Sequence, residues 1–397
     1  MSKDKLWNKN FCLIIIINFL VFMNHIMILT TFPMFLETLG QNEGTAGIAA
    51  FMFSFLAIVF RPVIGWMLDN GKRKSILIIG LVGMFLMPLG YMLSGILAGL
   101  GYSLVCSVIL ALTCRMLQGP SLAFSNTCTA TIASDSLPQS RFAEGMGYFG
   151  MATALATSIA PALSLFLFKK SFVLFFAVSS GFMLLSFILF ACMDTKAPHI
   201  EQKKKLTFKG LIEKNAVPAS IICFVFLLTW GALENFLAKF ALENGLPSGG
   251  IYFLITAVML LIVRVTLGKL ADKLGEGVFV YTCCAAMFVA FMLLALVPNA
   301  VTFYISAVLA GYAFGGIEPA LQSMAVHIAP PEKRGSANST FLCAYDLGMG
   351  CGGGLAGLLI ANCGYKNMFI VVSFATVVCV LLYVFWGRKH PSSLRNK

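Results

Sequence analysis

Charge is the scarcest property of this chain. Only 11% of its 397 residues are charged and 59% are hydrophobic, whereas about a quarter of an ordinary soluble domain is charged. The chain has 4 histidines, and no two of its cysteines have the C-x-x-C spacing of a metal or redox site. It also lacks the Gly-x4-Gly-Lys-Ser/Thr loop that binds ATP phosphates. These absences argue against an enzyme, a zinc module or an ATP-driven pump, and we expect no bound cofactor or metal.

Long apolar runs take the place of a charged surface. We count twelve runs of roughly 20 residues or more, each long enough to cross a bilayer as a helix. The first has no small-residue cleavage site behind it, so we interpret it as a retained span and not as a signal peptide. The sequence therefore predicts an all-α, multi-pass integral membrane protein with twelve transmembrane helices.

One polar, basic segment divides these runs into six and six. The predicted organisation is an N-terminal six-helix bundle over 1–193, a basic linker over 194–215, and a C-terminal six-helix bundle with a short tail over 216–397. The two bundles are expected to be related by pseudo-symmetry, because internal repeats are common in transporters.

The net charge of +12 follows topology and does not indicate nucleic-acid binding. Most lysines and arginines lie at the N-terminus, in the linker, in the tail and in loops on the same side of the membrane. This bias predicts that both termini lie in the cytoplasm. We expect the protein to reside in the cell membrane of a bacterium. The expected partners are membrane lipid, protons and a small-molecule substrate. We expect a monomer, because a single chain suffices for this fold.

A short pattern occurs twice, once in each half. Arg61, Gly65 and Asp69 stand at i, i+4 and i+8, and the second half repeats this spacing in Arg264, Gly268 and Asp272. Four-residue steps keep such residues near one helix face. A second pair of markers also supports two related halves, namely Pro138-Gln-Ser-Arg141 and Pro331-Glu-Lys-Arg334.

These motifs resemble the major facilitator superfamily. The run from Gly65 to Lys74 is similar to its Gly-x3-Asp-x2-Gly-Arg-Lys/Arg signature, with one residue fewer between Asp69 and Gly71. Arg115-Met-Leu-Gln118-Gly119 matches the superfamily's Arg-x2-Gln-Gly. Within it, the chain looks most like the drug:proton antiporter, or multidrug efflux, branch.

The resemblance implies a fold, an energy source and a gate. It implies that the first, fourth, seventh and tenth spans line a central cavity and that a proton gradient drives transport. It also implies that Asp69 meets the eleventh span at the cytoplasmic end of the molecule. The gate residues it assigns are Arg61, Gly65, Asp69, Arg73, Arg264, Gly268 and Asp272.

Ionisable side chains inside apolar spans are costly and are functional candidates. Burial disfavours the charged form of a carboxylate, so such a group can bind and release a proton or exchange it for a cation. We expect Arg115 to pair with one of these carboxylates and hold it ionised. The predicted proton-coupling residues are Glu234, Glu318, Asp346 and Arg115.

Polar and aromatic side chains on the same spans are the candidates for substrate binding. They are Asn24, His25, Arg115, Trp230, Glu234, Asn235, Phe314, Glu318 and Tyr345. Because the acids outnumber Arg115, this set favours a cationic or neutral amphipathic substrate.

The sequence thus predicts a proton-coupled exporter working by alternating access. Two alternatives stay open. One is an importer or antiporter of a small metabolite, with Arg115 and His25 holding an anionic group. The other is a non-transporting membrane receptor or lipid-handling protein on the same fold.

Overall fold

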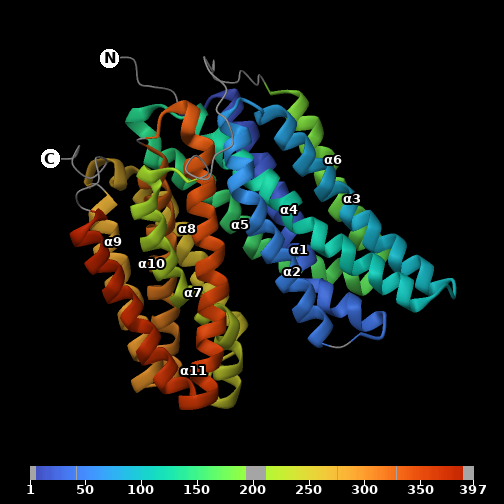
Figure 1. The fold of residues 1–397 in the computed structure, drawn as a ribbon. Helices are drawn as coiled ribbons and strands as arrows, with labels where there is room; N and C mark the ends of the chain where they lie inside the picture. The colour runs from blue at the N-terminus through green and yellow to red at the C-terminus, as the bar shows by residue number, and fades with distance from the viewer. Residues whose placement is uncertain (1–5, 42, 194–211, 275, 328, 388–397) are drawn as a thin grey trace.

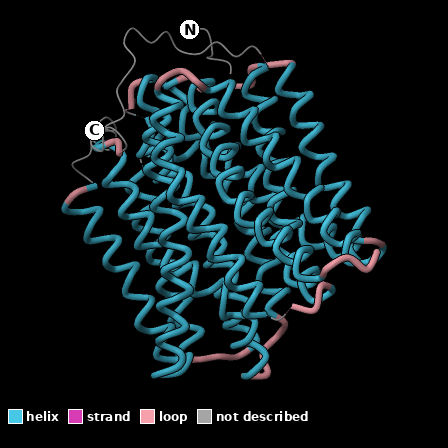
Figure 2. The backbone as a smooth tube through the Cα atoms, turned by 45° about the vertical axis from the view of Figure 1, so that its right-hand side comes forward, coloured by secondary structure: helices cyan, strands magenta, loops and turns pink. Residues whose placement is uncertain are grey.

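The computed structural model describes residues 6–41, 43–193, 212–274, 276–327 and 329–387. Within these ranges the side-chain surroundings of a few helical residues are not described, among them Gly268 and Asp272. In the described ranges the regular structure is entirely helical (Figure 2). Helices satisfy every backbone hydrogen bond within one segment, as an apolar bilayer interior demands.

The first half of the chain forms one bundle (Figure 1). Its helices are α1 (Lys9–Thr38), α2 (Glu43–Asp69), α3 (Arg73–Gly99), α4 (Leu104–Ser136), α5 (Phe142–Lys170) and α6 (Phe172–Ala191).

The second half forms the other bundle. Its helices are α7 (Val217–Glu243), α8 (Gly249–Leu274), α9 (Glu276–Leu296), α10 (Ala300–His327) and α11 (Arg334–Phe385).

The last helix, α11, contains two membrane spans. Gly364 interrupts it with φ 75°, a backbone conformation that residues with a side chain rarely adopt, and the chain reverses there. The apolar stretches on the two sides are Pro331–Ile360 and Asn362–Phe385. In the described chain 11 helical stretches are long and apolar enough to cross a membrane, and Gly249–Arg264 in α8 is a shorter apolar one. The predicted fold class, two bundles of membrane-spanning helices, is confirmed.

The bundles meet at one end of the molecule and diverge at the other (Figure 1). We call the end where α1 begins and α2 ends the closed end, and the opposite end, where α3 ends and α4 begins, the open end. Between the bundles α2 packs against α11 and α5 packs against α8. These two contacts bring the halves together around a central axis.

Candidate substrate cleft and gate

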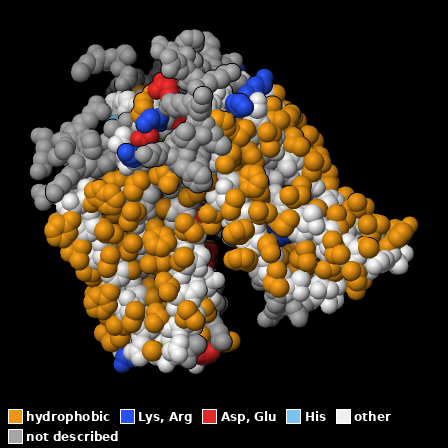
Figure 3. Space-filling model, viewed as in Figure 1, with side chains coloured by type: hydrophobic (Ala, Val, Ile, Leu, Met, Phe, Trp, Pro, Cys, Tyr) orange, Lys and Arg blue, Asp and Glu red, His pale blue; other side chains and the backbone are white. Residues whose placement is uncertain are grey.

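A cleft separates the two halves at the open end (Figure 3). It narrows toward the closed end, where the bundles touch. Apolar side chains cover most of the outer surface visible in this view, so charged groups inside the helical body stand out as exceptions.

Arg61 on α2 ties the first half to the second. Its Nε donates to Oδ2 of Asp346 on α11 at 2.7 Å, and its Nη1 donates to Oγ1 of Thr127 on α4 at 3.1 Å. Arg61 is buried, while the Asp346 side chain is 26% exposed. The hydroxyl of Ser339 on α11 also donates to the Arg61 carbonyl. The ion pair therefore spans the boundary between the halves.

Arg264, its counterpart in the repeat, holds a carboxylate of its own half. Its Nη2 donates to Oε2 of Glu318 on α10, and the Glu318 side chain is 19% exposed. Its guanidinium lies against Gly150 on α5, where an added Cβ would come within 2.4 Å of Nη1. The absence of a side chain at Gly150 thus lets Arg264 fit between α8 and α5.

Arg115 on α4 is surrounded by aromatic and amide groups. Its Nη1 donates to Oε1 of Gln118 at 2.8 Å, and the same oxygen accepts from the hydroxyl of Tyr91 at 2.9 Å. The guanidinium carbon lies 4.5 Å from the ring centre of Phe53 and 5.2 Å from that of Phe32. No carboxylate of the described chain pairs with it, so the ion pair expected for Arg115 is absent from this structure.

The two polar residues predicted on α1 have different surroundings. His25 stacks on Phe53, with ring centres 5.3 Å apart, and lies close enough to Arg115 and Arg61 to interact with their charges. Asn24 is fully buried and donates to the carbonyl of Ser179 on α6 at 2.9 Å. The structure therefore brings His25 to the Arg115 cluster, while Asn24 joins α1 to α6.

The second half supplies an aromatic and acidic wall. Trp230 on α7 stacks on Phe314 on α10, with ring centres 4.0 Å apart and an interplanar angle of 10°. Glu234 follows one turn later on α7 and is exposed. Tyr345 on α11 lies within electrostatic range of Glu234, Glu318 and Arg264. Five of the predicted residues thus gather on this wall.

Asn235 belongs to the packing between α7 and α11. Its Nδ2 donates to the Gly231 carbonyl at 2.7 Å, and a Cβ added at Gly353 on α11 would come within 2.8 Å of that nitrogen. Asn235 therefore interacts mainly with its own helix and with α11, although part of its side chain is exposed.

Asp69 on α2 joins the two halves at the closed end by capping the N-terminus of α11. Its carboxylate accepts from the backbone N–H of Ser336 at 3.1 Å and from the Ser336 hydroxyl. A carboxylate is stabilised at a helix N-terminus by the unpaired N–H groups and the helix dipole. Gly65 permits this approach, since a Cβ there would come within 2.7 Å of the Cβ of Ser339.

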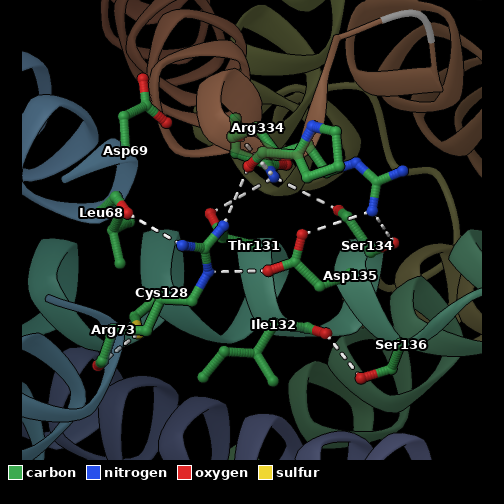
Figure 4. Close-up of polar contacts among 12 residues, drawn as sticks. Leu68, Asp69, Arg73, Cys128, Thr131, Ile132, Ser134, Asp135, Ser136 and Arg334 are labelled. Carbon is green, nitrogen blue, oxygen red and sulfur yellow. Dashed lines mark hydrogen bonds and ion pairs between the residues drawn. The ribbon is translucent and has the colours of Figure 1, made fainter. Parts of the chain in front are cut away.

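Asp135 at the end of α4 is the centre of a second closed-end contact (Figure 4). Arg73 on α3 donates to Oδ2 of Asp135 at 2.7 Å and to the Pro331 carbonyl at 3.1 Å. Arg334 on α11 donates to Oδ1 of Asp135 at 3.3 Å and to the Ser134 carbonyl at 2.9 Å. One carboxylate is therefore shared by arginines from both halves.

The family model of the Major Facilitator Superfamily matches this chain over residues 14–303 and 219–397. The chain belongs to this superfamily.

Relatives of this facilitator chain include named exporters. It is 23% identical over 380 residues to the staphylopine export protein of Staphylococcus aureus, covering 91% of this chain and 92% of that protein. It is 24% identical over 420 residues to multidrug resistance protein 2 of Bacillus subtilis, covering 98% of each. These matches agree with the efflux branch that the motifs resemble.

A solved structure shares the fold. The human organic anion transporter MFSD10 (TETRAN) superimposes with a TM-score of 0.80 at 15% identity, covering 94% of this chain and 98% of that one. Membership in this superfamily also means that the chain is a membrane transport protein and not an enzyme.

Of the gate residues predicted in the first half, Gly65, Asp69 and Arg73 lie together in the contacts at the closed end. Arg61 sits deeper, on a carboxylate predicted to couple protons. In the second repeat Arg264 likewise holds such a carboxylate, while the side-chain surroundings of Gly268 and Asp272 lie outside the described residues. A gate role for that second copy stays a prediction.

Sequence reasoning missed Asp135, Arg334 and Ser336 as members of the closed-end contacts. Asp135 is one polar residue in the Ser- and Thr-rich end of α4, and nothing in its spacing marks it. Arg334 was visible only as a repeat marker shared with Arg141. One signal could have identified Arg334 as a closed-end residue. It follows the tenth span, on the same side of the membrane as the basic loop that contains Arg73.

Proposed function

We propose that this protein exports small amphipathic molecules, cationic or neutral, across a bacterial cell membrane in exchange for protons. Relatives named for export and multidrug resistance support the direction. The observation that carries the proposal is that buried arginines hold two embedded carboxylates at contacts between helices, Arg61 with Asp346 and Arg264 with Glu318. Alternating access requires such contacts to form and break.

The orientation rests on the basic residues. With both termini in the cytoplasm, the closed end is cytoplasmic and the cleft faces outward. Asp69, Arg73 and Asp135 then close the path to the cytoplasm in this outward-facing state.

Proton binding would act on the two ion pairs. A proton on Asp346 removes the negative charge that attracts Arg61, and the pair between the halves loses its Coulomb attraction. A proton on Glu318 does the same to Arg264 beside α5. Because both carboxylates are partly exposed, protons from the outward-facing cleft can reach them. Low external pH would therefore favour release of both contacts and passage to the inward-facing state.

Glu234 has a different place in this cycle. Among the described residues it has no ion-pair partner, and it is exposed beside the stacked rings of Trp230 and Phe314. A cationic group of a substrate can pair with this carboxylate and rest on an aromatic face. Competition between substrate and proton at Glu234 would couple the two fluxes.

A flux assay in proteoliposomes tests the proposal. Purified protein is reconstituted with an imposed pH gradient, and transport of a fluorescent amphipathic cation such as ethidium is followed. We expect gradient-driven flux in the wild type, and a fall of at least about tenfold in Glu234→Gln and in Glu318→Gln, since each removes a titratable carboxylate.

The matched control is Glu37→Gln, because Glu37 is exposed near the open end of α1 and is outside the cleft clusters. Gradient-driven flux that persists in both test variants contradicts the assigned carboxylates. If no flux of any probe follows the gradient, the receptor or lipid-handling alternative is favoured.

One observation favours a second candidate, an importer or antiporter of a small metabolite. Arg115 is buried without a carboxylate partner in the described chain, as a site for an anionic group would be. Uptake of a labelled anionic metabolite that is stronger than efflux of amphipathic cations would support it.

A further inference from the structure

The charged side chains that are described away from the helix ends divide into two pairs and two single groups. They are three arginines and three carboxylates. Arg61 neutralises Asp346 and Arg264 neutralises Glu318. One cation and one anion remain, Arg115 and Glu234. The surplus of acids suggested by the sequence is therefore absent once the pairs are removed.

The surroundings of Arg115 contain unused hydrogen-bond donors. Its side chain is 2% exposed, and its Nε has no partner. The Nε2 of Gln118 is a further buried donor without a partner, and the Nδ1 of His25, which donates or accepts according to its tautomer, is also unpartnered. The rings of Phe53 and Phe32 lie against the guanidinium but cannot accept hydrogen bonds as an oxygen does. What this cluster lacks is an acceptor with negative charge, and a carboxylate supplies both.

The surroundings of Glu234 lack the opposite partner. Its carboxylate is exposed, and one turn earlier Trp230 lies flat against Phe314. Aromatic faces and a carboxylate together favour an ammonium group. Since Glu318 already has Arg264, Glu234 is the carboxylate of this wall that is open to a cation.

The two single charges lie at similar depths. At a rise of 1.5 Å per residue, Arg115 is about 16 Å from the start of α4 and Glu234 about 14 Å from the end of α7, both measured from the open end. One charge lies in each half. The two charges therefore have similar depth and opposite sign, one from each half of the molecule.

We propose that the cleft recognises a zwitterion, with the substrate carboxylate at Arg115, Gln118 and His25 and the substrate ammonium at Glu234 beside Trp230. This inference rests on the proposed transport function and narrows its neutral substrates to those with separated charges. Compared with a plain cation, a zwitterion also pairs Arg115, whose buried charge has no counterion among the described residues.

Three dipeptide probes with the same two aromatic rings test the charge pattern. Phenylalanyl-phenylalanine is a zwitterion at neutral pH, its methyl ester is a cation, and its N-acetyl derivative is an anion. Binding is measured by the rise in Tm of the purified full chain as each probe is titrated. For the wild type we expect the zwitterion to bind at least about tenfold more tightly than either derivative, the ratio for one lost charge contact.

Substitutions at the two single charges should divide the probes in opposite ways. Arg115→Gln should weaken the zwitterion and the anion by about tenfold or more and leave the ester unchanged. Glu234→Gln should weaken the zwitterion and the ester and leave the anion unchanged. Arg115→Lys retains the charge and is expected to recover part of the zwitterion affinity, which a general folding defect would not allow. Lys170→Gln removes an exposed cation near the open end and should affect no probe.

Several results would overturn the inference. They are an ester that binds the wild type as tightly as the zwitterion, a zwitterion that produces no shift, and an Arg115→Gln variant that weakens all three probes equally. The last result would mean that Arg115 only supports the packing of α2 and α4. The flux assay separates this from the proposed function. Gradient-driven ethidium flux without zwitterion preference sinks only the inference, whereas zwitterion-selective binding without any gradient-driven flux sinks only the transport cycle.

Discussion

The repeated arginines have the same place in the two halves but different partners. Arg61 crosses from α2 to Asp346 on α11 in the other half, whereas Arg264 reaches Glu318 on α10 of its own half and lies against Gly150 on α5. At one interface between the halves, the repeated arginine therefore forms an ion pair across the boundary. At the other, the repeated arginine packs against a glycine.

A second repeated pair differs in the same direction. Arg141 pairs with Glu144, three residues away and in the same half, whereas Arg334 reaches Asp135 and Ser134 in the opposite half. Together with Asp69 and Ser336, the Arg334 contacts form polar bonds between the halves where α11 meets α2 and α4. Similar sequence repeats therefore meet different carboxylates in the two halves. We infer that the α2–α11 side is the one that responds to charge.

Loss of Asp135 should give the largest effect. Asp135→Asn leaves two buried arginines, Arg73 and Arg334, without their shared charge, and breaking a buried pair costs about 3–5 kcal/mol. We expect a large drop in Tm and rapid hydrogen–deuterium exchange at the start of α11. Glu37→Gln is the control, because Glu37 is exposed near the open end of α1 and surface charges of this kind contribute about 1 kcal/mol or less. Equal effects of the two substitutions would contradict the asymmetry.

The two cleft carboxylates should differ in what their loss opens. Asp346→Asn weakens a charged hydrogen bond between the halves, worth about 1.5–3 kcal/mol, and should speed amide exchange at Ser336, whose N–H the closed end protects. Glu318→Gln weakens a bond within the second half and should leave that exchange nearly unchanged. Exchange mass spectrometry of peptides covering 334–340 measures both. Faster exchange in Glu318→Gln than in Asp346→Asn would reverse the conclusion.

The fold was accessible from sequence because it depends on simple quantities. Run length and hydrophobicity identify spans, and the doubled Arg-x3-Gly-x3-Asp pattern identifies two halves. The resemblance implied that Asp69 meets the eleventh span, and the structure has Asp69 and Gly65 in contact with α11, while their role as a gate stays a prediction. The break at Gly364 was visible only as a polar interval between two apolar runs.

The sequence did not reveal which side chains meet between distant helices. Nothing near Arg61 in sequence points to Asp346, because their contact depends on how two helices from different halves cross. The same limit explains why Arg115 was expected to hold a carboxylate and instead donates to Gln118 three residues away. It also explains why Asn24, placed on a cavity helix, faces Ser179 on α6.

A larger side chain at Gly65 should have the next largest effect. In Gly65→Leu the added side chain must enter space occupied by Ser336 and Ser339, and overpacking of this kind costs about 1–3 kcal/mol. The closed end should separate, with faster exchange at the start of α11 and flux reduced about tenfold or more. Gly181→Leu on α6 is the control, because a Cβ there meets nothing within 4 Å. Normal flux in Gly65→Leu would show that α2 and α11 do not need this close contact.

The smallest effect is expected at a pair that lies wholly within the second half. Lys333, which is 44% exposed, contacts Oε2 of Glu213 at 3.0 Å, and the Glu213 backbone N–H donates to Thr340 on α11 at 3.1 Å. Glu213→Gln keeps that backbone bond and removes an ion pair that solvent reaches from the Lys333 side, so the loss of stability should be about 1 kcal/mol or less and should shrink further at high salt. Because the pair does not join the halves, exchange at Ser336 should match the wild type. An effect on that exchange as large as the one from Asp346→Asn would mean that the residues leading into α7 help to close the gate, and the contrast between α2–α11 and the rest of the closed end would no longer hold.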